Sequence, residues 1–170
     1  MKCVTENEIQ TWLESRSIPK QPYQSSSAPE FYLQFYAPQN HTKLDAFIRE
    51  YYRLIVLNCD SLVQITDWSL YQQSEMIAVD GIRSSHGEDR TLIDAPGHSL
   101  GPNEAEIGIS LFSLSASYGW SSYLYASLNH STLYNWEGDI FDFWTDSEEM
   151  LQEMNLILKQ FELSETTEGK

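Results

Sequence analysis

The sequence predicts an α+β fold, a mostly antiparallel sheet packed against about four helices in a single domain. Apolar residues recur at helical spacing in four segments, and aromatic-rich segments with strand-like patterns lie between them. The two kinds of segment do not alternate in the regular way of a parallel sheet. The 170 residues, 41% of them hydrophobic, suffice for one core without a disulfide or a metal. We therefore expect one domain over residues 1–163 and a polar, disordered tail over residues 164–170.

The four expected helices each have a start signal. Thr5 and Glu8 have the spacing of a capping box, and apolar residues follow them on one helical face. The other three helices are expected to begin near Thr42, after Pro102, and at Asp146 or Ser147. Gly119 is placed to end the third helix.

Five segments are expected to form strands: residues 30–37, 61–66, 75–82, 120–126 and 131–136. In the third of these, Gly81 suggests a β-bulge. The last two strands follow one another through residues 128–130 and predict a hairpin. Residues 83–102 have few apolar positions, so we expect a long irregular segment there, and loops of that length are often functional.

The net charge of −15 is the most unusual global property of the chain. Such a field repels nucleic-acid phosphates and anionic lipids, so we expect neither direct nucleic-acid binding nor membrane binding. It attracts basic proteins, and a basic protein partner is the binding hypothesis that the charge favours. The alternative is that the acidic residues only keep the protein soluble.

The two cysteines, Cys3 and Cys59, are isolated in the sequence, which is typical of a reducing compartment. Soon after Lys2 comes the polar run Thr5-Glu6-Asn7-Glu8 and not the apolar segment of a signal peptide. The longest apolar runs are far too short to cross a membrane. We therefore expect a cytoplasmic protein.

A metal or acid–base site is one hypothesis for the segment from His86 to His98. Its imidazoles and carboxylates are groups that bind divalent metals or transfer protons. The candidate metal ligands are His86, Glu88, Asp89 and His98. Their spacing matches no helical zinc motif, so a structural role for these residues is the favoured interpretation, with no catalytic residue and no cofactor.

Two regions combine acidic and aromatic residues in the way of a surface that binds a basic protein. One is the connection after residue 66, and the other is the acidic C-terminal third. The candidate partner-binding residues are Trp68, Tyr71, Glu75, Glu88, Asp89, Glu137, Asp139, Asp142, Trp144 and Asp146. The alternative is that the aromatic residues belong to the core and that the acids are their solvated neighbours.

The stretch from Asp67 to Tyr125 resembles a largely uncharacterised bacterial family. The shared features are Trp68, Ser74-Glu75, Arg83-Ser84 with Gly87, Ala95-Pro96-Gly97-His98 and Gly119-Trp120. The resemblance implies no particular activity.

In overall character the chain is similar to immunity proteins of bacterial polymorphic toxin systems, which are small, acidic and rich in aromatic residues. That similarity implies an inhibitor that blocks the active site of a cognate toxin. Two alternatives remain open at this point: an acidic decoy that mimics nucleic acid, and a small metal-dependent hydrolase built on the His86–His98 segment.

Overall fold

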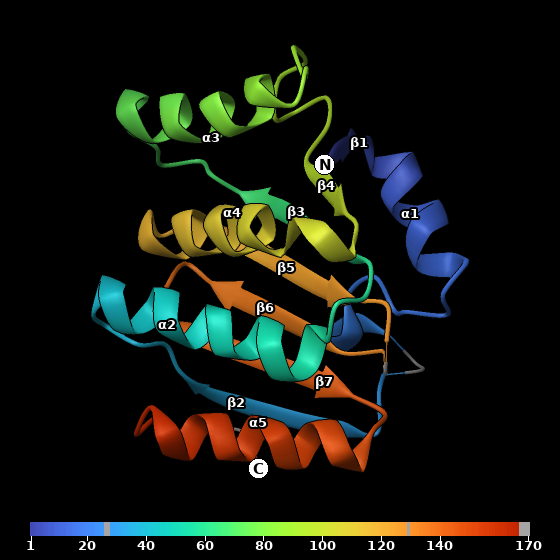
Figure 1. Ribbon diagram of the computed structural model, residues 1–170, viewed down its shortest axis with the longest axis vertical. Coiled ribbons are helices and arrows are strands. Elements are labelled where there is room, and N and C mark those ends of the chain that lie inside the picture. The colour runs from blue at the N-terminus through green and yellow to red at the C-terminus, as the bar shows by residue number, and fades with distance from the viewer. Residues whose placement is uncertain (26–27, 129, 167–170) are drawn as a thin grey trace.

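In the computed structural model, which describes residues 1–25, 28–128 and 130–166, the chain forms a seven-stranded sheet with five α-helices (Figure 1). The strand order is β1-β4-β3-β5-β6-β7-β2, and all neighbouring strands are antiparallel. The strands are β1 (Lys2–Val4), β2 (Phe31–Tyr36), β3 (Ser61–Asp67), β4 (Gly97–Leu100), β5 (Ser121–Ala126), β6 (Thr132–Trp136) and β7 (Ile140–Thr145). The predicted α+β class is confirmed.

The α-helices are α1 (Glu6–Glu14), α2 (His41–Tyr51), α3 (Gln73–Ser85), α4 (Ala105–Ser117) and α5 (Glu148–Gln160). Three short helical turns join them to the sheet: η1 (Pro22–Gln24), the π-helix η2 (Tyr52–Val56) and η3 (Pro102–Glu104). None of the described helices has the length and apolar character that crossing a bilayer requires.

The helix start signals in the sequence correspond to real caps. Thr5 and Glu8 form the expected capping box at α1, and the Ser147 hydroxyl accepts the Met150 N–H at the start of α5. Helix α2 begins slightly earlier than expected, because Asn40 Oδ1 accepts the N–H groups of Thr42 and Lys43. Side chains at these ends satisfy backbone N–H groups that the helix itself leaves free.

The strand expected over residues 75–82 is wrong, because this segment belongs to α3. Val79 and Arg83 are buried and Met76 is partly buried, which is helical spacing, whereas Ile77 between them is 64% exposed. Gly81 therefore makes no bulge. The segment expected to be irregular also contains the end of α3 and strand β4.

Two strands and part of the expected tail differ from the sequence analysis. Strands β1 and β7 were not expected, and the hairpin of β5 and β6 was, although Asn129 in its loop lies outside the described residues. The segment 164–166 is not free, since Ser164 O accepts the Tyr36 N–H and the Thr166 N–H bonds to Gln34 O, at the outer edge of β2. Residues 167–170 lie outside the described residues.

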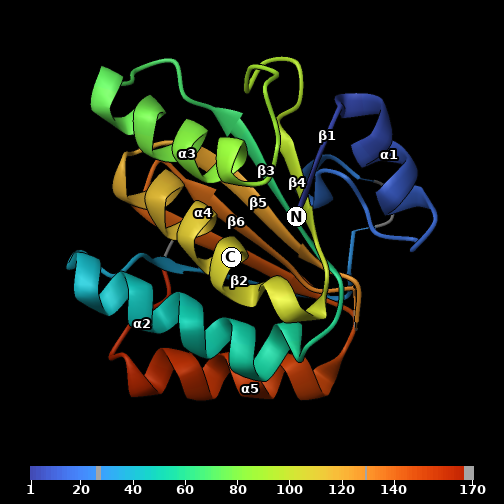
Figure 2. The same ribbon diagram turned by 45° about the horizontal axis from the view of Figure 1, so that its top comes forward.

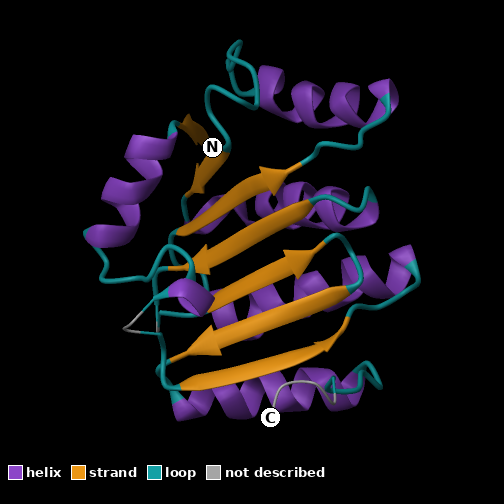
Figure 3. Cartoon of the chain, turned by 180° about the vertical axis from the view of Figure 1, so that it is seen from behind, coloured by secondary structure: helices purple, strands orange, loops and turns teal. Residues whose placement is uncertain are grey.

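The two faces of the sheet are covered very differently. Helices α2, α4 and α5 lie across one face, with α3 beside α4, and enclose the larger apolar core (Figures 1 and 2). The opposite face carries a smaller cluster formed by α1 and side chains of β3, β5, β6 and β7 (Figure 3). Of the described helical elements, only the short η1 lies over the β5–β6 part of this face, and it places Tyr23 against Tyr134 and Trp136.

Replacing either of two helical glycines by alanine should change the stability of the fold, in opposite directions for the two positions. Apart from the adjacent backbone of α3 itself, no described atom lies within 4 Å of a Cβ added at Gly81, so Gly81→Ala should stabilise the fold by ~1 kcal/mol through helix propensity. A Cβ at Gly108 in α4 would overlap the Tyr52 hydroxyl and lie 2.8 Å from Leu100 Cδ1, so Gly108→Ala should destabilise it by about 1–3 kcal/mol. Urea denaturation midpoints measure both effects. A loss of stability in Gly81→Ala would contradict the helical assignment of residues 73–85.

Candidate binding face

The part of the sheet that none of the described α-helices covers is a candidate binding surface. Because side chains alternate between the two faces of a strand, every second residue of β2, β6 and β7 points away from the main core. We call this surface, together with the ring of η1, the open face. Its residues are Tyr23, Tyr32, Gln34, Tyr36, Tyr134, Trp136, Ile140, Asp142 and Trp144.

Aromatic rings dominate the open face. Tyr36 is 52% exposed, and Tyr32 and Trp136 are each 41% exposed. The ring of Tyr23 lies 6.1 Å from that of Trp136, and Tyr32 packs 5.3 Å from Trp144. Half-exposed Tyr and Trp side chains held on a rigid sheet supply contact area at low entropic cost, and such residues carry most of the energy of protein interfaces.

A buried carboxylate lies at the centre of the open face. Asp142 is 3% exposed and accepts hydrogen bonds from Tyr32 Oη at 2.7 Å, from Gln34 Nε2 at 2.9 Å and from Trp136 Nε1. All three donors are uncharged, and the acceptor-only pattern is that of an ionised carboxylate. Burial and the bond to Asp142 both raise the pKa of Tyr32, so its phenol stays protonated and keeps donating.

The open face is built from stretches of sequence that lack the permanently charged basic side chains. Neither residues 21–42 nor residues 91–158 contain a Lys or an Arg. At one end of the face, Glu137 and Asp139 are exposed in the β6–β7 turn. At the other end, Asp146 is exposed and accepts the backbone N–H of Glu30 at 3.0 Å. The field over the aromatic rings is therefore negative.

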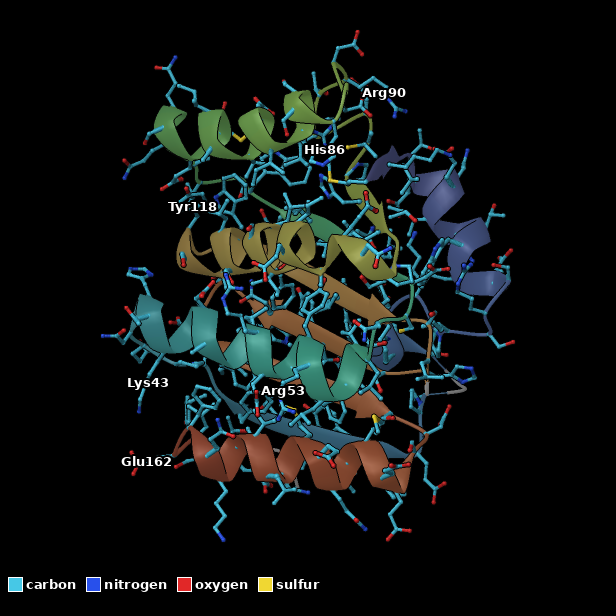
Figure 4. All side chains as sticks on the ribbon, in the orientation of Figure 1. Lys43, Arg53, His86, Arg90, Tyr118 and Glu162 are labelled. Carbon is cyan, nitrogen blue, oxygen red and sulfur yellow. The ribbon has the colours of Figure 1, made fainter. Side chains whose placement is uncertain are left out.

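Seven of the basic side chains elsewhere in the described part of the chain form ion pairs with acids of the same chain. The ion pairs are Lys2–Glu8, Arg16–Asp60, Lys20–Glu6, Lys43–Glu162, Arg49–Asp45, Arg49–Glu106, Arg53–Glu50 and Arg90–Glu88. Figure 4 shows Lys43 and Glu162 near the same end of the helical layer, at the ends of different helices. Around the open face, the ring of His130 lies 3.4 Å from Asp146, whereas Glu137 and Asp139 belong to none of these ion pairs.

The C-terminal candidates from the sequence fall on and around this face, but not all of them are accessible. Glu137, Asp139 and Asp146 are exposed, as a contact residue must be. Asp142 and Trp144 are buried and lie beneath the exposed rings. Both support exposed rings from below: Asp142 holds Tyr32 and Trp136, and Trp144 packs against Tyr32.

The remaining partner-binding candidates lie in other parts of the molecule. Trp68, Tyr71 and Glu75 belong to the β3–α3 region, and Figure 1 shows α3 at the opposite end of the sheet from β2. Trp68 packs partly against the core, Tyr71 is 57% exposed, and Glu75 accepts the Gln72 N–H at the start of α3. Asp89 is exposed in the turn after α3. The structure does not bring this set together with the open face.

The four candidate metal ligands do not come together in the structure. His86 is exposed at the end of α3, near Arg90 (Figure 4), and its Nδ1 lies 3.0 Å from Ile82 O. Glu88 is bound to Arg90, which lowers the pKa of that carboxyl to about 2. His98 is fully buried on β4. Among the described residues, no three His, Cys, Asp or Glu side chains are placed to hold a metal, so the hydrolase alternative loses its proposed site.

The His86–His98 segment is instead organised by a buried arginine. Arg83 is 1% exposed and donates from Nη1 to Ala95 O at 2.8 Å and to His98 Nε2 at 2.9 Å. Its Nη2 donates to Arg90 O at 3.0 Å and to Thr91 O at 3.1 Å. One guanidinium therefore ties α3 to the following loop and to β4.

The protonation state of His98 follows from these bonds. Its Nδ1 lies 3.2 Å from Val63 O, and because a carbonyl only accepts, Nδ1 carries the hydrogen and Nε2 accepts from Arg83. Burial, and next the charge of Arg83, lower the pKa of His98 to about 4. His98 is therefore a neutral structural residue.

Replacing Arg83 should destabilise the fold far more than replacing an exposed arginine. Lysine cannot reach the four acceptors of the guanidinium, so Arg83→Lys should lower the free energy of unfolding by roughly 3 kcal/mol. Arg53, which is exposed and paired with Glu50, is the matched control, and Arg53→Lys should leave the free energy of unfolding nearly unchanged. Equal losses in urea denaturation would contradict the role of Arg83.

The buried neutral His98 should make stability depend on pH. With a pKa of about 4 in the folded state against about 6.5 unfolded, the unfolded state binds more protons between these values. The free energy of unfolding should therefore fall as pH is lowered from 6.5 to 4, by up to ~3 kcal/mol from this group. Because other titrating groups are common to both proteins, the stability difference between wild type and His98→Gln isolates the effect. A difference that is constant from pH 7 to pH 4.5 would contradict it.

The open face was only partly evident in the sequence. The acids near its ends were, but Tyr23, Tyr32, Tyr36 and Trp136 were not among the candidates, although the long stretches without Lys or Arg were an available signal. No protein-family model matches the chain, and searches of curated proteins and of solved structures find no similar protein. The role of the open face therefore has to be inferred from its own chemistry.

Proposed function

We propose that this protein is an acidic protein-binding inhibitor, an immunity-type protein that neutralises a basic toxin by covering its active site with the open face. The observation that carries the proposal is the composition of that face. Exposed aromatic rings surround a buried carboxylate, acids lie at both ends, and the sequence stretches that form it contain no Lys or Arg.

The physical chemistry of this surface suits a tight complex with a basic protein. Tyr32, Tyr36 and Trp136 offer aromatic area that a partner can desolvate, which is the usual source of affinity. The net charge of −15 raises the rate of encounter with a positively charged partner. The same charge disfavours nucleic acid and anionic membranes as direct ligands.

A rigid platform also favours inhibition. The open-face residues lie on paired strands, and Asp142 holds Tyr32 and Trp136 by hydrogen bonds before any partner arrives. Little conformational entropy is then lost on binding. The two cysteines are free thiols, which is consistent with action in the cytoplasm of the producing cell.

The test is capture from the native cell with purified protein as bait, followed by kinetics on the captured protein. We expect a basic protein bound one to one, its activity inhibited, with an association rate that falls as salt rises. Tyr36→Ala should weaken binding roughly tenfold or more, because an exposed aromatic anchor is lost. Tyr71→Ala, which removes an equally exposed tyrosine from the β3–α3 connection, should leave the affinity within about twofold.

Two results would count against the proposal. One is capture of an acidic or neutral protein whose association rate does not respond to salt. The other is a loss of affinity in Tyr71→Ala as large as that in Tyr36→Ala, because the contact surface would then not be confined to the open face.

A further inference from the structure

We propose that the open face contains a seat for one arginine side chain of the partner, on the rings of Tyr32 and Trp136 above Asp142. This inference rests on the proposed function, because it names the group of the basic partner that the face recognises. It assigns the binding of one specific cation to the centre of the face, whereas the surrounding acids attract any positively charged group.

The first argument is the electrostatics of Asp142. Its carboxylate is buried, and its donors are a phenol, an amide and an indole, each of which is neutral. Neutral donors stabilise the negative charge without cancelling it. Because the site is partly shielded from water, the field of this charge above the rings is stronger than that of an exposed acid. A cation placed there is attracted without having to displace an existing ion pair.

The second argument is the state of the two rings. Tyr32 and Trp136 both donate a hydrogen bond to Asp142, and such bonds to an anion polarise the donor group. The polarisation increases the electron density of the phenol and indole rings. A ring richer in electrons attracts a cation more strongly over its face.

The third argument is the placement of the rings. Tyr32 lies on β2 and Trp136 on β6, so they reach Asp142 from the two strands that flank β7. Both rings remain 41% exposed while the carboxylate beneath them is covered. Tyr23 packs against Trp136 and Trp144 packs against Tyr32, which fixes both rings from the sides. The rings are therefore held in place before binding.

The chemistry selects a guanidinium over other ligands. A phosphate or carboxylate would be repelled by Asp142 and by the acids at the ends of the face. An apolar side chain would dehydrate the charge further without compensating it. Arginine is planar and weakly hydrated and stacks on aromatic rings, whereas the ammonium of lysine is strongly hydrated. The ligand that this site fits best is therefore an arginine side chain of the protein partner.

The test uses the whole protein labelled with ¹⁵N and a probe that contains one arginine. The probe is acetyl-Gly-Arg-Gly-amide, and the matched control is the same peptide with citrulline, which is nearly the same shape but uncharged. We expect the Trp136 indole signal to shift in a saturable way with the arginine peptide, with an affinity at least ~5-fold higher than for the citrulline peptide. The other four tryptophans serve as internal references.

Two variants on the same strand and face locate the seat. Tyr32→Val removes one ring of the seat and should abolish most of the arginine response. Tyr36→Val removes a more exposed ring of β2 that does not bond to Asp142, and should keep the response. Valine suits a strand, so both variants should fold. Asp142→Asn, read in the same titration, should reduce the affinity roughly fivefold by removing the charge beneath the rings.

The outcomes separate this inference from the proposed function. If a basic partner is captured through the open face but the two peptides shift the Trp136 signal equally, the seat is refuted and the inhibitor function stands. If the arginine peptide binds at Trp136 but no basic partner is captured, the seat stands and the inhibitor function fails. Equal arginine responses in Tyr32→Val and Tyr36→Val would refute the position of the seat.

Discussion

The buried guanidinium of Arg83 is the interaction on which one end of this fold depends. It satisfies three backbone carbonyls and one imidazole nitrogen, so a single side chain fixes the loop after α3 against β4. Strand β4 in turn pairs with both β1 and β3. His98 is neutral beside this cation because its own burial, and next the charge of Arg83, lower the pKa of its imidazole.

A second buried charge, of opposite sign, organises the other end of the sheet. Asp142, like Arg83, is held by neutral partners, yet the two sites differ in what covers them. Arg83 is sealed beneath backbone and loop, whereas Asp142 lies under two half-exposed rings. The first arrangement ties α3, the following loop and β4 together. The second leaves a negative charge without a positive partner close to the surface, and this charge is the physical basis of both functional proposals.

The sequence predicted those parts of the fold that local chemistry decides. Thr5 and Ser147 cap helices as expected, because capping depends on a few neighbouring residues. Helix α3 was mistaken for a strand because its buried side is narrow and includes an arginine, which periodicity does not count as apolar. The open face could not be predicted as a unit. Whether Tyr32 or Phe35 is buried depends on which side of the sheet the helices cover, and distant segments decide that.

The pairing of residues 164–166 with β2 limits how this protein can meet another chain. Ser164 and Thr166 occupy backbone groups of Tyr36 and Gln34 along that outer edge, and the strand at the far edge, β1, is only three residues long. Extending the sheet with a strand from a partner, which reads backbone more than side chains, is therefore disfavoured. If the open face binds a partner as proposed, substitutions among its surface rings and acids would change which partner fits while the strands beneath remain unchanged.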